Sequence, residues 1–213
     1  QMTAYEIMPS LVGSEMCIRD SIRMSVPEQV THQELLNERL LRTISALCEE
    51  GLNPGIVSGG STPTLWRSHE IQALTEIRAG SCIFFDREAL EVGVANAEDL
   101  AYTVLATVIS TAVPGQVVVD AGSKALAKES RSGEAGFGIL FDRPEVVVSS
   151  VSEEHGVLDL SGIDWHPKVG ERVRIIPNHV CVSVNLQEEL LARDDGTHCF
   201  IELEARGRRY WSV

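Results

Sequence analysis

The chain has 213 residues, a hydrophobic content of 44% and a formal net charge of −13, a composition typical of a globular protein with its own core. The acidic excess argues against polyanionic partners, because nucleic acids and anionic membranes are bound by basic faces, and no stretch approaches the roughly 20 apolar residues that span a bilayer. The five scattered cysteines indicate a reducing compartment. We therefore predict a cytoplasmic protein that binds neither nucleic acid nor membranes.

Residues 1–22 stand apart from the rest of the chain. They show neither helical nor strand periodicity, and the run from Tyr5 to Ser21 is similar to translated adapter sequence from assembled sequencing reads. We predict a non-native or disordered tail, with a poorly ordered native terminus as the alternative, and we exclude it from the prediction of the fold.

An amphipathic helix is predicted next. Thr31 and Glu34 have the spacing of a capping box, in which two side chains satisfy backbone N–H groups at a helix start. Apolar residues then recur at helical spacing, and Gly51 can end the helix. The pair Ile56-Val57 predicts a strand that ends at a glycine-rich turn, residues 58–62. Helix, strand and glycine-rich turn form the repeating unit of a β/α barrel, whose active site lies where its strands end.

The pattern of apolar residues changes near residue 83. Short segments rich in β-branched and aromatic residues, separated by Gly, Pro and Asp, predict an antiparallel β domain. The predicted strands cover residues 83–85, 105–109, 116–119, 138–141, 146–151, 172–176, 180–184 and 199–204, and residues 98–111 are alternatively part helix. The predicted fold class is therefore α/β plus all-β: residues 23–76 form the last units of a β/α barrel, and residues 77–213 form a β domain with a metal site.

The glycine-rich turn is a candidate anion site. Gly60 lets the backbone approach an anion closely, and the hydroxyls of Ser61 and Thr62 can add hydrogen bonds to phosphate oxygens. Gly-Gly-Ser also occurs in plain loops, which is the alternative interpretation.

His179 and Cys181 are candidate metal ligands. They lie two residues apart in a predicted strand, so their side chains point to one face. Imidazole with thiolate favours zinc over magnesium or calcium, and two protein ligands leave positions open for water or substrate. The alternative is a half-buried histidine beside a packed thiol.

Two further groups are weighed for acid and base chemistry. Residues 152–156 combine two carboxylates with His155, although a solvated loop is equally simple. In the turn 120–124, Asp120 and Lys124 can simply pair with each other. The remaining lysines are Lys128 and Lys168, and none of the three follows a predicted barrel strand.

Several blocks, taken in order, resemble the D-serine dehydratase and D-threonine aldolase family of pyridoxal-phosphate enzymes. The resemblance covers about residues 24–213 through the segments 58–64, 76–86, 120–124, 152–156, 169–181, 184–185 and 205–208. It implies the fold-type III architecture of alanine racemase, with an N-terminal barrel that carries the cofactor, a C-terminal β domain, and a homodimer for the full-length protein.

The resemblance also implies roles for the candidate residues. Gly60, Ser61 and Thr62 would hold the phosphate of pyridoxal 5'-phosphate, and His179 and Cys181 would bind the zinc that draws away the substrate hydroxyl. The implied reaction is the elimination of water and ammonia from a D-β-hydroxy amino acid. D-threonine aldolase-like cleavage and a non-catalytic metal-binding domain are the alternatives.

Departures from the family pattern limit these expectations. Ala79 and Cys82 stand where the family usually has Pro and Tyr, so an aromatic contact to the cofactor from that position is not expected. No lysine matches the family's Schiff-base lysine, and the catalytic residues are therefore left unassigned. We expect the chain to be the C-terminal portion of a longer pyridoxal-phosphate-dependent lyase.

Overall fold

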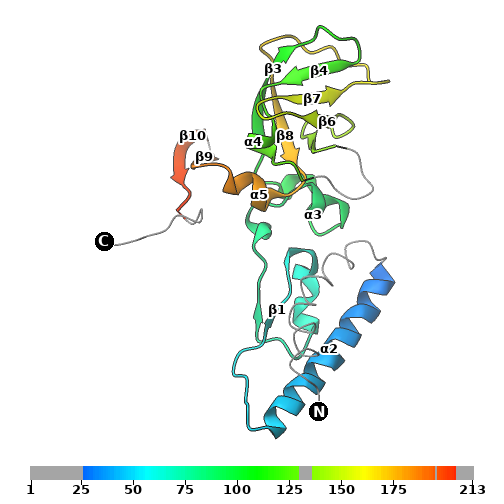
Figure 1. Ribbon diagram of the computed structural model, residues 1–213, viewed down its shortest axis with the longest axis vertical. Helices are drawn as coiled ribbons and strands as arrows, with labels where there is room; N and C mark the ends of the chain where they lie inside the picture. Colours follow the sequence, from blue (N-terminus) through cyan, green and yellow to red (C-terminus); the bar gives the residue numbers. More distant parts are fainter. Residues whose placement is uncertain (1–25, 130–135, 195, 205–213) are drawn as a thin grey trace, which may run out of the picture. The chain divides into compact units, whose positions relative to one another are not determined.

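The computed structural model describes residues 26–129, 136–194 and 196–204 (Figure 1). The tail predicted for residues 1–22 and the block 205–208 lie outside the described residues. The chain divides into two compact units, one built from residues up to 83 with 89–96, and one from residues 84–88 with 97 onward. Among the described helices, none is long and apolar enough to cross a membrane.

The first unit begins with α2 (Val26–Glu49). Thr31 lies inside this helix, so the predicted start at a Thr31–Glu34 capping box is wrong. The helix begins five residues earlier, and Pro27 is compatible with this start because its fixed φ and missing N–H are tolerated in a first turn. The predicted end at Gly51 is confirmed: φ is +77°, and the N–H of Leu52 donates to the carbonyl of Leu47 at 2.9 Å.

Two short strands follow α2 in the same unit. β1 (Ser58–Gly59) pairs in parallel with β2 (Glu76–Ile77), and η1 (Thr62–Glu70) lies between them in the chain. The strand predicted at 56–57 is therefore shifted onto the glycine-rich turn itself. Parallel strands joined through a helical segment are the unit of a β/α barrel. Asn37 ties α2 to this unit, because its side-chain oxygen accepts the N–H of Ala73 at 3.1 Å.

The second unit is built around a closed antiparallel barrel with strand order β3-β4-β7-β6-β5-β8 (Figure 1). Val108, Val148, Leu158 and Ile175 have no exposed surface and lie in its core. The predicted β domain is confirmed in class, although β7 was missed as a strand because it follows the polar loop 152–155 directly. The strands are β3 (Val104–Ser110), β4 (Gln116–Val119), β5 (Gly138–Leu140), β6 (Val147–Val151), β7 (Gly156–Asp159) and β8 (Arg172–Pro177).

The remaining elements are short. They are η2 (Ser81–Ile83), α3 (Arg87–Glu91), η3 (Ala97–Asp99), α4 (Ser123–Leu126), α5 (Val180–Asn185), and the hairpin of β9 (Glu189–Asp194) with β10 (Thr197–Glu202). The strand predicted at 83–85 is wrong, because η2 ends there and Phe85 takes a left-handed conformation with φ +52°. The predicted strand at 180–184 is also wrong, because these residues form α5.

Residues of α5 form a helix because of tertiary contacts. Alternating valines favour a strand, but the backbone N–H of Val180 donates to Asp86 Oδ2 at 2.9 Å. This carboxylate satisfies an N–H group that a helix start leaves without an intrahelical partner. Ser183 Oγ, one turn further on, donates to the carbonyl of Ala125 at 2.6 Å and lies 3.0 Å from the Tyr102 hydroxyl. Local propensity is therefore overridden by contacts with distant segments.

Candidate functional site

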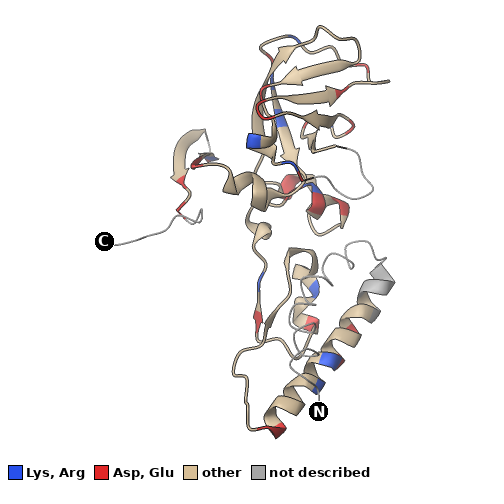
Figure 2. Ribbon diagram, in the orientation of Figure 1, with Lys and Arg blue, Asp and Glu red and all other residues tan. Residues whose placement is uncertain are grey.

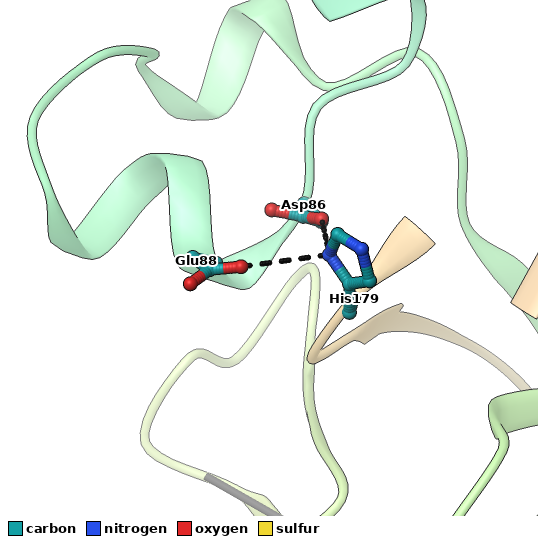
Figure 3. Close-up of side chains that lie close together, drawn as sticks. All are labelled: Asp86, Glu88 and His179. Carbon is teal, nitrogen blue, oxygen red and sulfur yellow. Dashed lines mark hydrogen bonds and ion pairs between the residues drawn. The ribbon is translucent and has the colours of Figure 1, made fainter. Parts of the chain in front are cut away.

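A carboxylate–histidine cluster of Asp86, Glu88 and His179 lies in the second unit (Figure 3). Asp86 directly precedes α3, Glu88 lies in the first turn of α3, and His179 is the N-cap of α5 just beyond β8. One ligand atom from each residue lies within 4.8 Å of the others, and among the described residues no other group of three metal-ligating side chains converges in this way. The end of β8 thus brings together side chains more than ninety residues apart.

Both carboxylates approach the same ring nitrogen. His179 Nδ1 lies 3.1 Å from Asp86 Oδ2 and 3.5 Å from Glu88 Oε2, while Nε2 is on the opposite side of the ring (Figure 3). The Asp86 side chain is 4% exposed, whereas those of Glu88 and His179 are 27% and 30% exposed. Asp86 is therefore the buried partner, and Glu88 reaches the imidazole from the solvent side.

The cluster strongly favours a positive charge. The hydrogen bond to Asp86 is the main cause that raises the pKa of His179 from 6.5 to about 12, with further increases from Cys181 and Glu88 and a smaller opposing effect of burial. The local excess of acidic residues is visible on and just before α3 (Figure 2). A divalent cation is attracted by the same field and competes with the proton for the imidazole.

Cys181 is brought to this cluster by α5 and not by a strand. The predicted shared strand face is wrong, but Cys181 is near enough to the imidazole to contribute to the raised pKa of His179, and its side chain is exposed. The assignment of His179 and Cys181 as the metal ligands stays a prediction. The described cysteines are all free thiols, namely Cys48, Cys82, Cys181 and Cys199.

Asn178 fixes the connection between β8 and α5. It is 2% exposed, and its side-chain oxygen accepts from the Arg87 guanidinium at 3.2 Å. Its side-chain nitrogen donates to the carbonyls of Glu129 and Gly136 at 3.1 and 2.9 Å. Asn178 lies in the family-like segment 169–181 but was assigned no role from the sequence, and Asp86 and Glu88 were not predicted as site residues. The only available signal was that Asp86 ends one of the family-like blocks.

The glycine-rich turn has unpaired donors in the first unit. Gly60 has φ +73°, which favours glycine, and Ser61 and Thr62 begin η1. Within the described residues, Ser61 Oγ and Thr62 Oγ1 are buried and make no hydrogen bond. Thr64 differs, since its hydroxyl oxygen accepts the N–H of Ser61 at 3.1 Å. Buried hydroxyls without partners are costly, and phosphate oxygens at a helix start would satisfy them.

The two acid and base candidates turn out to be neighbours. The N–H groups of Ser123 and Lys124 donate to the carbonyls of Ser152 and Glu153 at 2.8 and 3.1 Å. Lys124 Nζ pairs with Glu154 at 2.6 Å on the surface, so the predicted pairing with Asp120 is wrong. Asp120 instead accepts the backbone N–H of Thr107 at 2.6 Å. These groups join two turns of the barrel.

A sequence profile described as "Putative serine dehydratase domain" matches residues 101–192. D-threo-3-hydroxyaspartate dehydratase of Delftia sp. is 35% identical over 159 residues, which are 67% of this chain and 42% of that enzyme. An uncharacterized protein of Mycobacterium bovis is 35% identical over 116 residues, and the match covers 53% of this chain and 87% of that protein. The chain belongs to the D-serine dehydratase and D-threonine aldolase family.

The solved structures agree with this membership. The Delftia dehydratase matches with a TM-score of 0.75 and 31% identity over 87% of this chain and 54% of its own. Variants of that enzyme have also been solved, including one with a histidine replaced by alanine and one with a cysteine replaced by alanine in the metal-free form. The D-threonine aldolase of Arthrobacter is 32% identical over 76% of this chain and 42% of that enzyme.

The predicted family and fold class are therefore confirmed, with neighbours that have an alanine-racemase-like fold. The named relatives are dehydratases and aldolases of D-hydroxy amino acids. This chain spans about half of the Delftia dehydratase structure or less, since it covers 54% of that chain and 42% of the curated sequence.

We expect His179→Gln to destabilise the metal-free protein most at low pH. The folded pKa of His179 lies above its ordinary value of 6.5, so the protonated ring's contribution is fully present below about pH 6.5 and is lost as pH rises towards about 12. Urea unfolding in the presence of a chelator should show a larger loss at pH 6 than at pH 10. His166→Gln is the control, because that side chain is 87% exposed. A loss independent of pH would contradict the charged cluster.

Thr62→Val and Thr64→Val should have different effects on the stability of the ligand-free protein. Replacing the unpaired hydroxyl of Thr62 by a methyl group of similar shape is expected to leave the free energy of unfolding unchanged or to raise it. Removing the bonded hydroxyl of Thr64 should cost about 0.5–1.5 kcal/mol. Thermal unfolding in phosphate-free buffer measures both. Equal destabilisation by the two substitutions would show that the Thr62 hydroxyl has a partner.

Proposed function

We propose that this chain is the C-terminal portion of a zinc- and pyridoxal-phosphate-dependent lyase that eliminates water and ammonia from a D-β-hydroxy amino acid. The observation that carries the proposal is the position of His179. It lies two residues after the end of β8, near Cys181 and two carboxylates. The relatives of the chain include D-threo-3-hydroxyaspartate dehydratase and D-serine dehydratase.

The donor set fits zinc. Imidazole and thiolate are typical zinc ligands, and the neighbouring carboxylates favour a cation. The Delftia enzyme supports the pairing. Its cysteine-to-alanine variant was solved in a metal-free form, and the histidine replaced in its other variant lies two residues before that cysteine. His179 and Cys181 have the same order and spacing. We therefore assign them as the zinc ligands of this chain, with open positions for a substrate hydroxyl.

The glycine-rich turn fits the phosphate of pyridoxal 5'-phosphate. Gly60 would allow close approach, and the unpaired hydroxyls of Ser61 and Thr62 would donate to phosphate oxygens. When bound, the cofactor supplies an electron sink for the negative charge at Cα, and zinc supplies a Lewis acid for the departing β-hydroxyl. The role of the chain's own residues is to bind and orient these groups.

The lysine that would bind the cofactor covalently is assigned to a part of the protein outside this sequence. Lys124, Lys128 and Lys168 all belong to the second unit, and Lys124 is paired with Glu154. The coverage of 42% of the Delftia dehydratase supports this assignment. We propose that the longer polypeptide forms the homodimer implied by the family resemblance and works in the cytoplasm.

An aldolase is the second candidate. D-threonine aldolase of Arthrobacter and 3-hydroxy-D-aspartate aldolase of Paracoccus denitrificans are 32% and 30% identical to this chain. The same metal ligands would then hold the β-hydroxyl while the Cα–Cβ bond breaks. No described residue separates the two reactions, so the products decide between them.

The reaction is tested on the longer polypeptide that contains the cofactor lysine. Ammonia and keto acid are measured from D-serine and D-threo-3-hydroxyaspartate, and glycine with acetaldehyde is measured from D-threonine. Ammonia release that a chelator abolishes supports the dehydratase. Glycine and acetaldehyde identify the aldolase, and the absence of all these products contradicts a lyase.

Cys181→Ser should remove most of the bound zinc, because it replaces a thiolate ligand by a weakly coordinating hydroxyl. Cys199→Ser is the matched control, since Cys199 is also an exposed free thiol but lies in β10. Elemental analysis after exhaustive dialysis should find one zinc ion per chain in the wild type and in the Cys199→Ser control. Equal zinc loss in both variants would indicate adventitious binding to exposed thiols.

A further inference from the structure

We propose that Asp86 is the positioning residue of the metal site, which holds His179 so that Nε2 is presented to the ion. The inference rests on the proposed function, because it takes His179 as a zinc ligand. Asp86 is assigned no direct bond to the metal. Its role is to fix the orientation and the tautomer of the imidazole ring.

The hydrogen bonds of Asp86 support this role. A single oxygen, Oδ2, accepts from His179 Nδ1 at 3.1 Å and from the backbone N–H of Val180 at 2.9 Å. The carboxylate is thereby tied to the backbone of the residue that follows the histidine. Ring and carboxylate cannot shift independently, so the direction of the Nε2 lone pair is set by the start of α5.

The side of the ring that Asp86 approaches is the second observation. Both carboxylates face Nδ1, and Nε2 points away from them (Figure 3). A histidine that binds a metal through one nitrogen commonly donates its other N–H to a carboxylate, which fixes the ring and raises its basicity. Asp86 has this relation to His179, with 4% of its side chain exposed.

The backbone before Asp86 is also shaped for this contact. Phe85 has φ +52°, a left-handed conformation that a bulky residue rarely adopts. The neighbouring carbonyl of Phe84 accepts the N–H of Ala101 at 2.9 Å, which fixes the segment. The left-handed residue turns the chain immediately before Asp86. Strain of this kind is retained where the surrounding structure needs a particular side-chain direction.

Glu88 provides the matched comparison. Its Oε2 lies 3.5 Å from the same Nδ1, so it carries the same charge to the same ring. It is more exposed than Asp86, and within the described residues no backbone N–H donates to it. A purely electrostatic effect on the ion would involve both carboxylates, whereas positioning depends on Asp86.

The test compares zinc affinity in the wild-type chain, Asp86→Asn and Glu88→Gln by competition with a chromophoric chelator. We expect Asp86→Asn to weaken zinc binding by about 10–100-fold, as for loss of the hydrogen-bond partner of a metal-bound histidine. Glu88→Gln should weaken it by no more than about fivefold, as for a partly exposed ion pair. Equal losses in the two variants, or no loss in Asp86→Asn, would overturn the positioning role.

A second measurement does not depend on the folding of any variant. Nitrogen-15 spectra of the zinc-loaded wild-type chain should show a protonated Nδ1 and a metal-bound Nε2 at His179. A metal-bound Nδ1 would overturn the inference and leave the zinc site standing. A wild-type chain that binds no zinc at all would overturn the proposed metal function together with it.

Discussion

The site in the second unit depends on one carboxylate that two segments share. Asp86 Oδ2 accepts the ring N–H of His179 and the backbone N–H of Val180, across more than ninety residues of sequence. The first contact orients a candidate metal ligand, and the second satisfies the start of the helix that carries Cys181. Local fold and site chemistry are therefore not separable here, because one buried acceptor determines both.

The barrel explains why this carboxylate can be placed so accurately. β8 pairs with β3 and β5 and delivers Pro177 and Asn178 to the barrel end, where Asn178 bonds to Arg87, the residue after Asp86. A close-packed core of fully buried valines and leucine keeps these strands in register. The residues of the site that follow β8 are therefore held by a strand packed into the barrel core.

The sequence predicted what periodicity and spacing can encode. Short runs of β-branched residues located most barrel strands, and the spacing of His179 and Cys181 identified a candidate metal pair. The same logic failed at residues 180–184, because alternating valines favour a strand while the helix is set by Asp86. Asp86 itself was not identified as a site residue, because the strands β3 to β8 separate it from its partners in the sequence. No local sequence pattern indicates a contact between residues so far apart.

The two candidate sites favour ligands of opposite charge. The site in the second unit favours a cation, and the turn in the first unit favours an anion. In the carboxylate–histidine cluster, the carboxylates raise the pKa of His179 and three ligand atoms converge, so a proton or a metal ion stabilises it. The glycine-rich turn has buried hydroxyls that lack acceptors within the described residues, so an anion stabilises it. The unpaired hydroxyls cost the ligand-free protein stability, whereas the protonated His179 already stabilises the metal-free cluster up to high pH. A phosphate group would relieve the first condition, and a metal ion would take the place of the proton in the second. Each unit therefore selects its ligand through the charge or the hydrogen-bonding capacity of its own side chains.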